Sequence, residues 1–254
     1  MKAVNLRRIT LSCAYVLMAH VCPNVHAQSR ECLPGHSPGF WSKRATDLCT
    51  AVKGTVPDAT RDMRIKSPDG ERAVHIVRDS WWVEVGSKRI DLASGRAYVS
   101  YPAELAWSPN SRFFYVTWSE GNIDGWITQV YEVSESDVRE IPNVARTIKE
   151  AFDQRHACVS VGADGTRTRY EPNIGALAWL GDSSGLVIVA ESIPDSRCDA
   201  QAGEFGGYVV SIPGGNILRR YSPSELVKRW RGVLGRRLQG NYADLSPEQK
   251  RAEP

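Results

Sequence analysis

The sequence predicts an all-β fold with minor α, in which β-propeller-like antiparallel blades form an incomplete or open array with an inserted helix and a C-terminal helix. The main observation is a repeat. Leu-Ala-Trp, a polar turn and a strand-like run occur at Leu105–Val116 and again at Leu177–Val189. A related segment without the triplet, Arg64–Val77, precedes both. Self-similarity of this kind indicates supersecondary units that stack on their neighbours.

The three segments share a polar turn followed by a strand. The turn reads Pro-Asp-Gly, Pro-Asn-Ser or Gly-Asp-Ser, and these residue types adopt turn φ values and bond to their own backbone. The strands after the turns are rich in β-branched and aromatic residues. A hairpin-like stretch follows each one, over Trp81–Leu92, Trp126–Ile141 and Gly207–Tyr221. Each unit therefore has the content of a propeller blade, four short antiparallel strands.

These residues carry a family resemblance. Trp-Ser-Pro-Asp-Gly, then a strand and a hairpin ending near "DLASG", resembles the blades of TolB-like or WD40-like exported propellers, over residues 60 to 221. Here the motif is split: Ser67–Gly70 lacks the tryptophan, Trp107–Pro109 has it, and the third copy keeps Trp179 and Asp182. The resemblance implies a fold and no particular function, because such blades serve many functions. We expect the two repeated tryptophans to anchor their strands against neighbouring sheets.

Three units leave closure open, because closed propellers have about four to eight blades. Residues 38 to 63 could supply a fourth, degenerate blade, or helices could cover an open arc. A homodimer could also cover the free sheet edges, since unpaired edges invite pairing. The alternative to all of these is a set of ordinary hairpins in another antiparallel sheet.

Two helices interrupt the strands. The spacing of Val144, Ile148, Ala151 and Phe152 predicts an amphipathic helix over 143–154. Ser-Pro-Ser-Glu from Ser222 has the cap, first-turn proline and third-position Glu of a helix start.

The two ends of the chain have compositions of their own. A basic start, an apolar run and Val-His-Ala predict a signal peptide over residues 1–27, cleaved after Ala27, and thus a periplasmic or secreted protein. The apolar run is too short to span a bilayer. We divide the rest into an N-terminal disulfide-containing segment (28–59), the propeller-like domain with its C-terminal helix (60–238) and a disordered tail (239–254).

Cysteine usage and charge fit this compartment. Four mature cysteines, Cys32, Cys49, Cys158 and Cys198, predict two disulfides, and we favour Cys32–Cys49 and Cys158–Cys198 among three pairings. Zinc is the rival, but the spacing does not support it, so no cofactor or metal is expected. Removing three of the 32 cations with the signal leaves 29 against 29 acids, which gives no general attraction to nucleic acid.

Two stretches are candidate binding surfaces. In the first, Trp118, Glu120, Asp124 and Trp126 surround a predicted loop. In the second, residues 216–238, cations far outnumber acids, and they include Arg229, Arg236 and Arg237. An anionic partner would suit that excess, although cations also solvate an ordinary helix face.

Catalysis has little support in the sequence. No Gly-x-Ser-x-Gly run is present and the histidines are scattered. We predict an exported binding or scaffold protein that recognises another envelope macromolecule, a protein or else a glycan, without catalysis. A carbohydrate hydrolase using Glu120 and Asp124 is one alternative. An inhibitor or immunity protein for an exported toxin is another.

Overall fold

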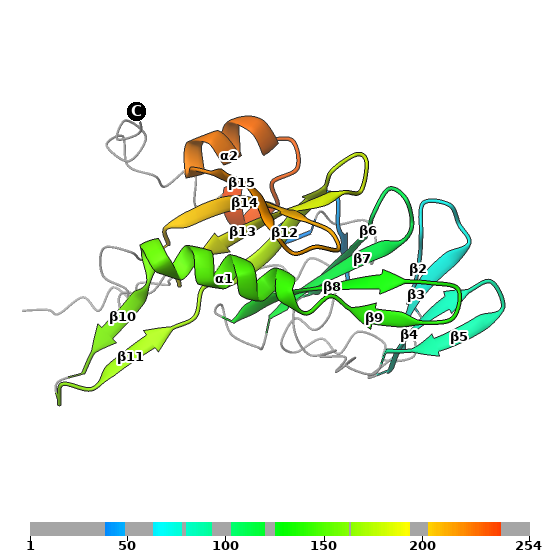
Figure 1. The fold of residues 1–254 in the computed structure, drawn as a ribbon, viewed down its shortest axis with the longest axis horizontal. Coiled ribbons are helices and arrows are strands. Elements are labelled where there is room, and N and C mark those ends of the chain that lie inside the picture. Colours follow the sequence, from blue (N-terminus) through cyan, green and yellow to red (C-terminus); the bar gives the residue numbers. More distant parts are fainter. Residues whose placement is uncertain are drawn as a thin grey trace, which may run out of the picture. The chain divides into compact units, whose positions relative to one another are not determined.

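The fold is mainly antiparallel β-sheet with minor α, as a computed structural model of the chain shows (Figure 1). The structure describes residues 39–48, 63–77, 80–92, 103–119, 125–162, 164–193 and 203–239. The predicted signal peptide, Cys32, Cys49, Cys198, Glu120, Asp124 and residues 240–254 lie outside these ranges. The coarse fold class predicted from the sequence is confirmed.

Three sheets follow one another along the chain, each a meander in which consecutive strands pair. The first sheet consists of β2 (Met63–Lys66), β3 (Arg72–Val77), β4 (Ser80–Val85) and β5 (Lys88–Asp91). The second consists of β6 (Ala103–Trp107), β7 (Phe113–Ser119), β8 (Trp126–Val133) and β9 (Val138–Glu140). The third consists of β12 (Asn173–Trp179), β13 (Gly185–Glu191), β14 (Phe205–Ser211) and β15 (Ile217–Tyr221).

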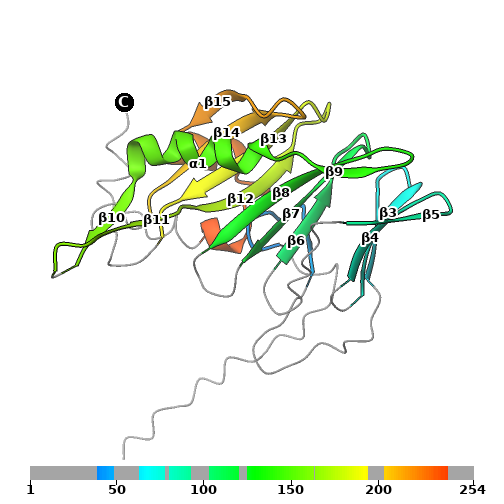
Figure 2. The ribbon, with the colours of Figure 1, turned by 60° about the horizontal axis from the view of Figure 1, so that its bottom comes forward.

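The remaining elements join or extend these sheets. A short strand, β1 (Thr46–Asp47), pairs with β6 and makes the second sheet five-stranded. The helix α1 (Asn143–His156) and the two-stranded ribbon β10 (Cys158–Val161) and β11 (Arg167–Tyr170) lie between the second and third sheets in sequence (Figure 2). The helix α2 (Pro223–Trp230) begins with the predicted capping box at Ser222 and contacts β14 and β15. None of the described helices is long and apolar enough to cross a membrane.

The three repeated turns share one backbone conformation. The last residues of these turns, Gly70, Ser111 and Ser183, have φ of 76°, 59° and 61°. These values lie in the left-handed region that glycine tolerates best. The residue before each supplies a side-chain oxygen to the backbone two positions on. Asp69 Oδ1, for example, accepts from Glu71 N at 3.0 Å. The Asp or Asn of the repeat thus fixes the turn, as Asx turns do.

The same repeat joins each sheet to the one before it. The Ser111 hydroxyl accepts the backbone N–H of Asp69 at 3.1 Å, and the equivalent bond runs from Asn110 N to Ser183 at 3.0 Å. Trp107 Nε1 donates to the carbonyl of Ile65 at 3.0 Å, and Trp179 repeats this with Ala106 at 3.1 Å. The predicted role of the two tryptophans as anchors between sheets is confirmed.

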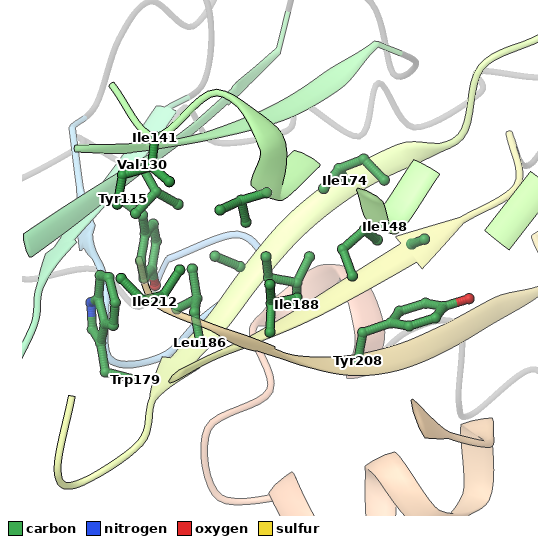
Figure 3. Close-up of a cluster of buried hydrophobic side chains, with 14 of the residues drawn as sticks. Tyr115, Val130, Ile141, Ile148, Ile174, Trp179, Leu186, Ile188, Tyr208 and Ile212 are labelled. Atoms are coloured by element: carbon green, nitrogen blue, oxygen red, sulfur yellow. The ribbon is translucent and has the colours of Figure 1, made fainter. Parts of the chain in front are cut away.

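Apolar side chains fill both spaces between the sheets. On β7, Phe114 and Val116 belong to the core shared with the first sheet, while Phe113 and Tyr115 belong to the core shared with the third sheet and α1. Alternation of this kind gives a strand buried on both faces. Figure 3 shows the second of these cores, where Tyr115 lies near Trp179. The predicted apolar stripe of α1 is buried here as well.

The two outward faces of this set of sheets differ. The outer face of the first sheet carries mostly polar side chains: Arg64, Lys66, His75, Trp82, Glu84 and Arg89. The outer face of the third sheet is apolar. It is covered by α2 and by the segments 39–48 and 230–239. The core that they share with the sheet includes Trp41, Leu177, Val187, Val189, Val209, Leu226 and Leu234.

The N-terminal residues do not form a fourth blade in the part that is described. Residues 39–48 contribute one two-residue strand, and they lie against the second and third sheets. Residues 49–62 lie outside the described ranges, so the alternative of a degenerate blade over residues 38 to 63 stays untested there, while within residues 39–48 the one strand joins the second sheet.

Candidate interaction face at the junction of the chain-end segments

The chain-end junction is the contact between residues 39–48 and residues 230–239. Backbone bonds run from Lys43 N to Val233 O (2.8 Å), from Gly235 N to Trp41 O (2.6 Å) and from Arg237 N to Phe40 O (3.0 Å). The segments are antiparallel, with Ser42 bridged to Leu234. A Cβ on Gly235 would lie 2.4 Å from Phe40 O, so only glycine fits this close approach without displacement.

Aromatic rings fill the interior of the junction. Trp41 is fully buried on the third sheet over Gly175, where a Cβ would lie 1.9 Å from Cδ2 of its indole ring. The ring of Phe40 stacks on Trp126 with centroids 4.7 Å apart, and Trp41 meets Trp126 edge-on at 5.9 Å. These contacts bury Trp126, which starts β8, to 3% exposure.

A buried ion pair lies beside the rings. Arg237 Nε donates to Glu191 Oε2 at 2.6 Å, and the two side chains are 6% and 0% exposed. Asn173 Nδ2 donates to the same carboxylate at 3.3 Å, and its Oδ1 accepts from Trp126 N at 3.1 Å. The guanidinium also lies over the ring of Trp41, 5.1 Å from its centroid. Removing either charge would leave the other buried and uncompensated.

A second buried carboxyl holds the N-terminal segment. Glu104 Oε2 accepts from Trp41 N at 3.1 Å and Ser42 N at 3.5 Å, while Oε1 has no hydrogen-bond partner among the described residues. Burial raises the pKa of Glu104 to about 8, and the negative charge of Asp47, its cross-strand neighbour on β1, acts in the same direction. Burial and the negative charge of Glu104 also raise the pKa of the nearby Tyr115 hydroxyl. Glu104 is therefore a structural acid that favours its neutral form.

The exposed side of the junction is basic. Lys43 and Arg44 follow the paired residue Ser42, and α2 with the turn after it adds Lys228, Arg229 and Arg231. These five exposed cations form no ion pair with any residue that the structure describes. Arg236, 57% exposed, does pair with Asp47 at 3.2 Å. We call Lys43, Arg44, Lys228, Arg229 and Arg231 the basic face.

The structure places the predicted surface residues in different environments. Arg229 is exposed on α2, and Trp118, half-buried on β7, donates to Gln129 Oε1 at 3.0 Å. Trp126 and Arg237 are buried in the junction, which corrects the expectation that they present a binding surface. The reason is that Phe40 and Trp41 cover them. Glu120 and Asp124 lie outside the described residues.

The sequence alone did not indicate that residues 39–48 form part of this junction. The signal available there is "GFWSKR", two aromatic residues separated by one serine from two cations. Nothing in its spacing shows that Trp41 packs over Gly175, because that contact joins residues far apart in the chain.

The described part of the chain contains one cysteine, Cys158, and no cluster of side chains suited to a metal ion. No group of three or more His, Cys, Asp or Glu side chains there could hold a metal ion. Cys158 is buried and disulfide-bonded. Its partner lies outside the described ranges, so the pairing with Cys198 stays a prediction.

No protein-family model matches this chain, and no curated protein matches it.

Proposed function

We propose that this chain is a periplasmic or secreted binding protein, in which three propeller-like blades form an open scaffold that recognises another envelope macromolecule. Its action is recognition rather than chemistry. The partner is a protein, and a glycan is the second choice.

The observation that supports this proposal is that the buried ionisable groups are already engaged in structural contacts. Glu104, Glu191 and Arg237, the groups that would attract attention as catalytic candidates, are 1%, 0% and 9% exposed. Each already binds part of the chain-end junction. Groups closed to solvent and committed to backbone and ion-pair contacts hold a surface in place, whereas a catalytic group must reach its substrate.

The repeat geometry supports the propeller-like description. Each of the three sheets contains a four-strand meander with the same turn, and in the second and third sheets a tryptophan before the turn and a serine in it bond back to the preceding sheet. Polar side chains on one outward face and a covering helix on the other suit an array that ends without closing, as terminal repeats do in other repeat proteins.

The test is capture of a partner by the mature protein. Immobilised protein is incubated with envelope extract, crosslinked, and bound proteins are identified against an unrelated exported protein of similar charge. We expect one partner to be enriched reproducibly. Failure to capture any partner would overturn the proposal, and turnover of a glycan or peptide by the purified protein would favour an enzyme instead. The hydrolase alternative depends on Glu120 and Asp124, which the structure does not describe, and no observation here favours the inhibitor or immunity alternative.

A further inference from the structure

We infer that the basic face is a docking surface for a stretch of acidic side chains on a partner protein. This inference depends on the proposed binding function and names the surface and the chemistry of the partner.

The first argument is a difference in ion pairing across the surface. Away from the junction, many cations of the sheets and α1 already have acidic partners: Arg64 with Glu84, Arg72 with Asp69, Arg89 with Asp91, Arg112 and Arg139 with Glu132, Lys149 with Glu171, and Arg169 with Asp153. On the basic face none of the five cations has such a partner among the described residues, whereas elsewhere the exposed cations without one, such as Lys66 and Arg167, are interspersed with paired ones. The exposed acid on α2, Glu225, accepts from Ser222 N at 3.0 Å as part of the capping box. Mutual repulsion of these cations is therefore uncompensated within the described part of the chain.

The second argument is that helix electrostatics do not account for the face. Cations in the last turn of a helix interact favourably with the partial negative charge there, which is an ordinary structural role for Lys228 and Arg229. Lys43 and Arg44 lie on a different segment, and Arg231 comes after the last helical residue. Two segments that are far apart in sequence but paired at Lys43 and Val233 thus both carry exposed cations.

The third argument is that the face is held rigidly. The backbone bond from Lys43 to Val233 and the bond from Gly235 to Trp41 fix the two segments side by side. Since Ser42 is opposite Leu234 and the segments are antiparallel, Arg44 lies alongside the residues just before Val233, which include Arg231. A face that is already arranged loses little further freedom when a ligand binds.

The chemistry of the face favours carboxylates on a protein. Three of its five cations are arginines, whose guanidinium fork matches a carboxylate with two parallel hydrogen bonds. The same junction already uses this pairing in Arg236–Asp47 and Arg237–Glu191.

Other polyanions fit less well. The large apolar side chains most exposed in the described part, Val161 at 65% and Leu218 at 59%, lie on β10 and β15 rather than on the face, so it offers no apolar anchor for a lipid surface. The whole chain has a net charge of only +3, small for a nucleic-acid binder.

The experiment measures binding of fluorescent poly-L-glutamate by anisotropy, at low and at high salt. The test variant is Arg44→Glu/Arg231→Glu, which reverses charge on both segments and leaves the backbone bonds in place. The control is Lys66→Glu/Arg167→Glu, the same charge change at two exposed cations elsewhere that likewise form no ion pair with any described residue. We expect the test variant to bind about tenfold or more weakly and the control to stay within about twofold of wild type. Added salt should weaken wild-type binding. Thermal melting checks that both variants fold.

Equal loss in test variant and control, or no wild-type binding to the probe, would overturn the inference. So would binding of heparin or phosphatidylglycerol vesicles at this face in preference to poly-L-glutamate. Repeating the extract capture with the test variant separates the two proposals. If it captures the same partner as wild type, the binding function stands and the basic face is not the contact. If wild type captures nothing, the binding function itself fails.

Discussion

The outer faces of the first and third sheets show two ways in which a row of sheets can end. On the first sheet the outward side chains are polar or paired with one another, as in the ladder from Arg64 to Glu84 and from Glu84 to His75. On the third sheet the outward side chains are apolar, and α2 and the chain-end junction cover them. The first solution needs only surface residues, whereas the second makes the sheet dependent on distant segments. We therefore expect substitutions at the covered face to cost more than matched ones at the polar face.

The first copy of the repeat differs from the other two at the positions that contact a preceding sheet. Where the second and third units have Trp107 and Trp179, the first has Lys66, and where they have a left-handed serine, it has Gly70. Those tryptophan and serine side chains are the ones that bond to a preceding sheet. The first unit thus lacks both groups with which it would join a predecessor.

The largest difference in the free energy of unfolding is expected between breaking the buried ion pair Arg237–Glu191 and breaking the partly exposed pair Arg64–Glu84. Arg237→Met leaves Glu191 charged and buried, and we expect a loss of about 3 to 5 kcal/mol in the free energy of unfolding. Arg64→Met breaks the partly exposed pair with Glu84 and should cost much less, because solvent screens that pair. Denaturant unfolding measures both. Equal losses would contradict the proposed dependence on burial.

A second difference is expected in how the free energy of unfolding depends on pH. Glu104 in the folded protein has its pKa raised to about 8 by burial, from 4.5. Between these values the folded state holds the extra proton, so the free energy of unfolding falls as pH rises. Glu104→Gln should flatten this dependence between about pH 5 and pH 9, measured as the melting temperature across the series.

The control for this prediction lies on the polar face. Hydrogen bonds from Arg64 and His75 lower the pKa of Glu84. Its contribution is therefore present above the unfolded pKa and lost only as pH falls through the folded value, so Glu84→Gln should leave the slope in the neutral and alkaline range unchanged. An unchanged slope in Glu104→Gln would refute the assignment.

A third difference concerns close packing. Gly175→Ala places a Cβ 1.9 Å from the Trp41 ring, which must then move. We expect a loss of about 2 to 3 kcal/mol, with a change in tryptophan fluorescence. Gly181→Ala, in the turn of the same sheet with nothing within 4 Å of the new Cβ, should have little effect. Wild-type stability in Gly175→Ala would show that Trp41 is not held there.

The smallest expected difference is between two tryptophans. Trp107→Phe removes the bond to Ile65 O between the first and second sheets, at a cost of about 1 to 2 kcal/mol. Trp82→Phe changes a half-buried ring on the polar face that stacks on His75 and lies under Arg89, and should cost less. A greater loss at Trp82 would mean that the outer face, not the contact between sheets, needs the indole.

Local features of the fold could be predicted from the sequence. The turns, the helix start at Ser222 and the stripe on α1 depend on neighbouring residues, and the structure has them where they were expected. Trp126 was misread because it follows a polar loop in sequence, and only the approach of Phe40 buries it. The pairing of Lys43 with Val233 has no periodic signal at all, because it is an isolated contact outside the named strands between residues far apart in the chain. Two of the five cations of the basic face, Lys43 and Arg44, were missed for that reason.

The chain-end junction also sets an order for biosynthesis. Asp47 and its partner Arg236 are 189 positions apart, and a ribosome delivers the chain from the N-terminus onwards. Until residues 223–239 have emerged, the apolar side of β12 to β14 lacks this cover, so a chain without them carries a surface to which chaperones bind. Arrival of these residues is then the event that buries this surface, and a chain cut short before Gly235 would keep it exposed to proteases and to aggregation.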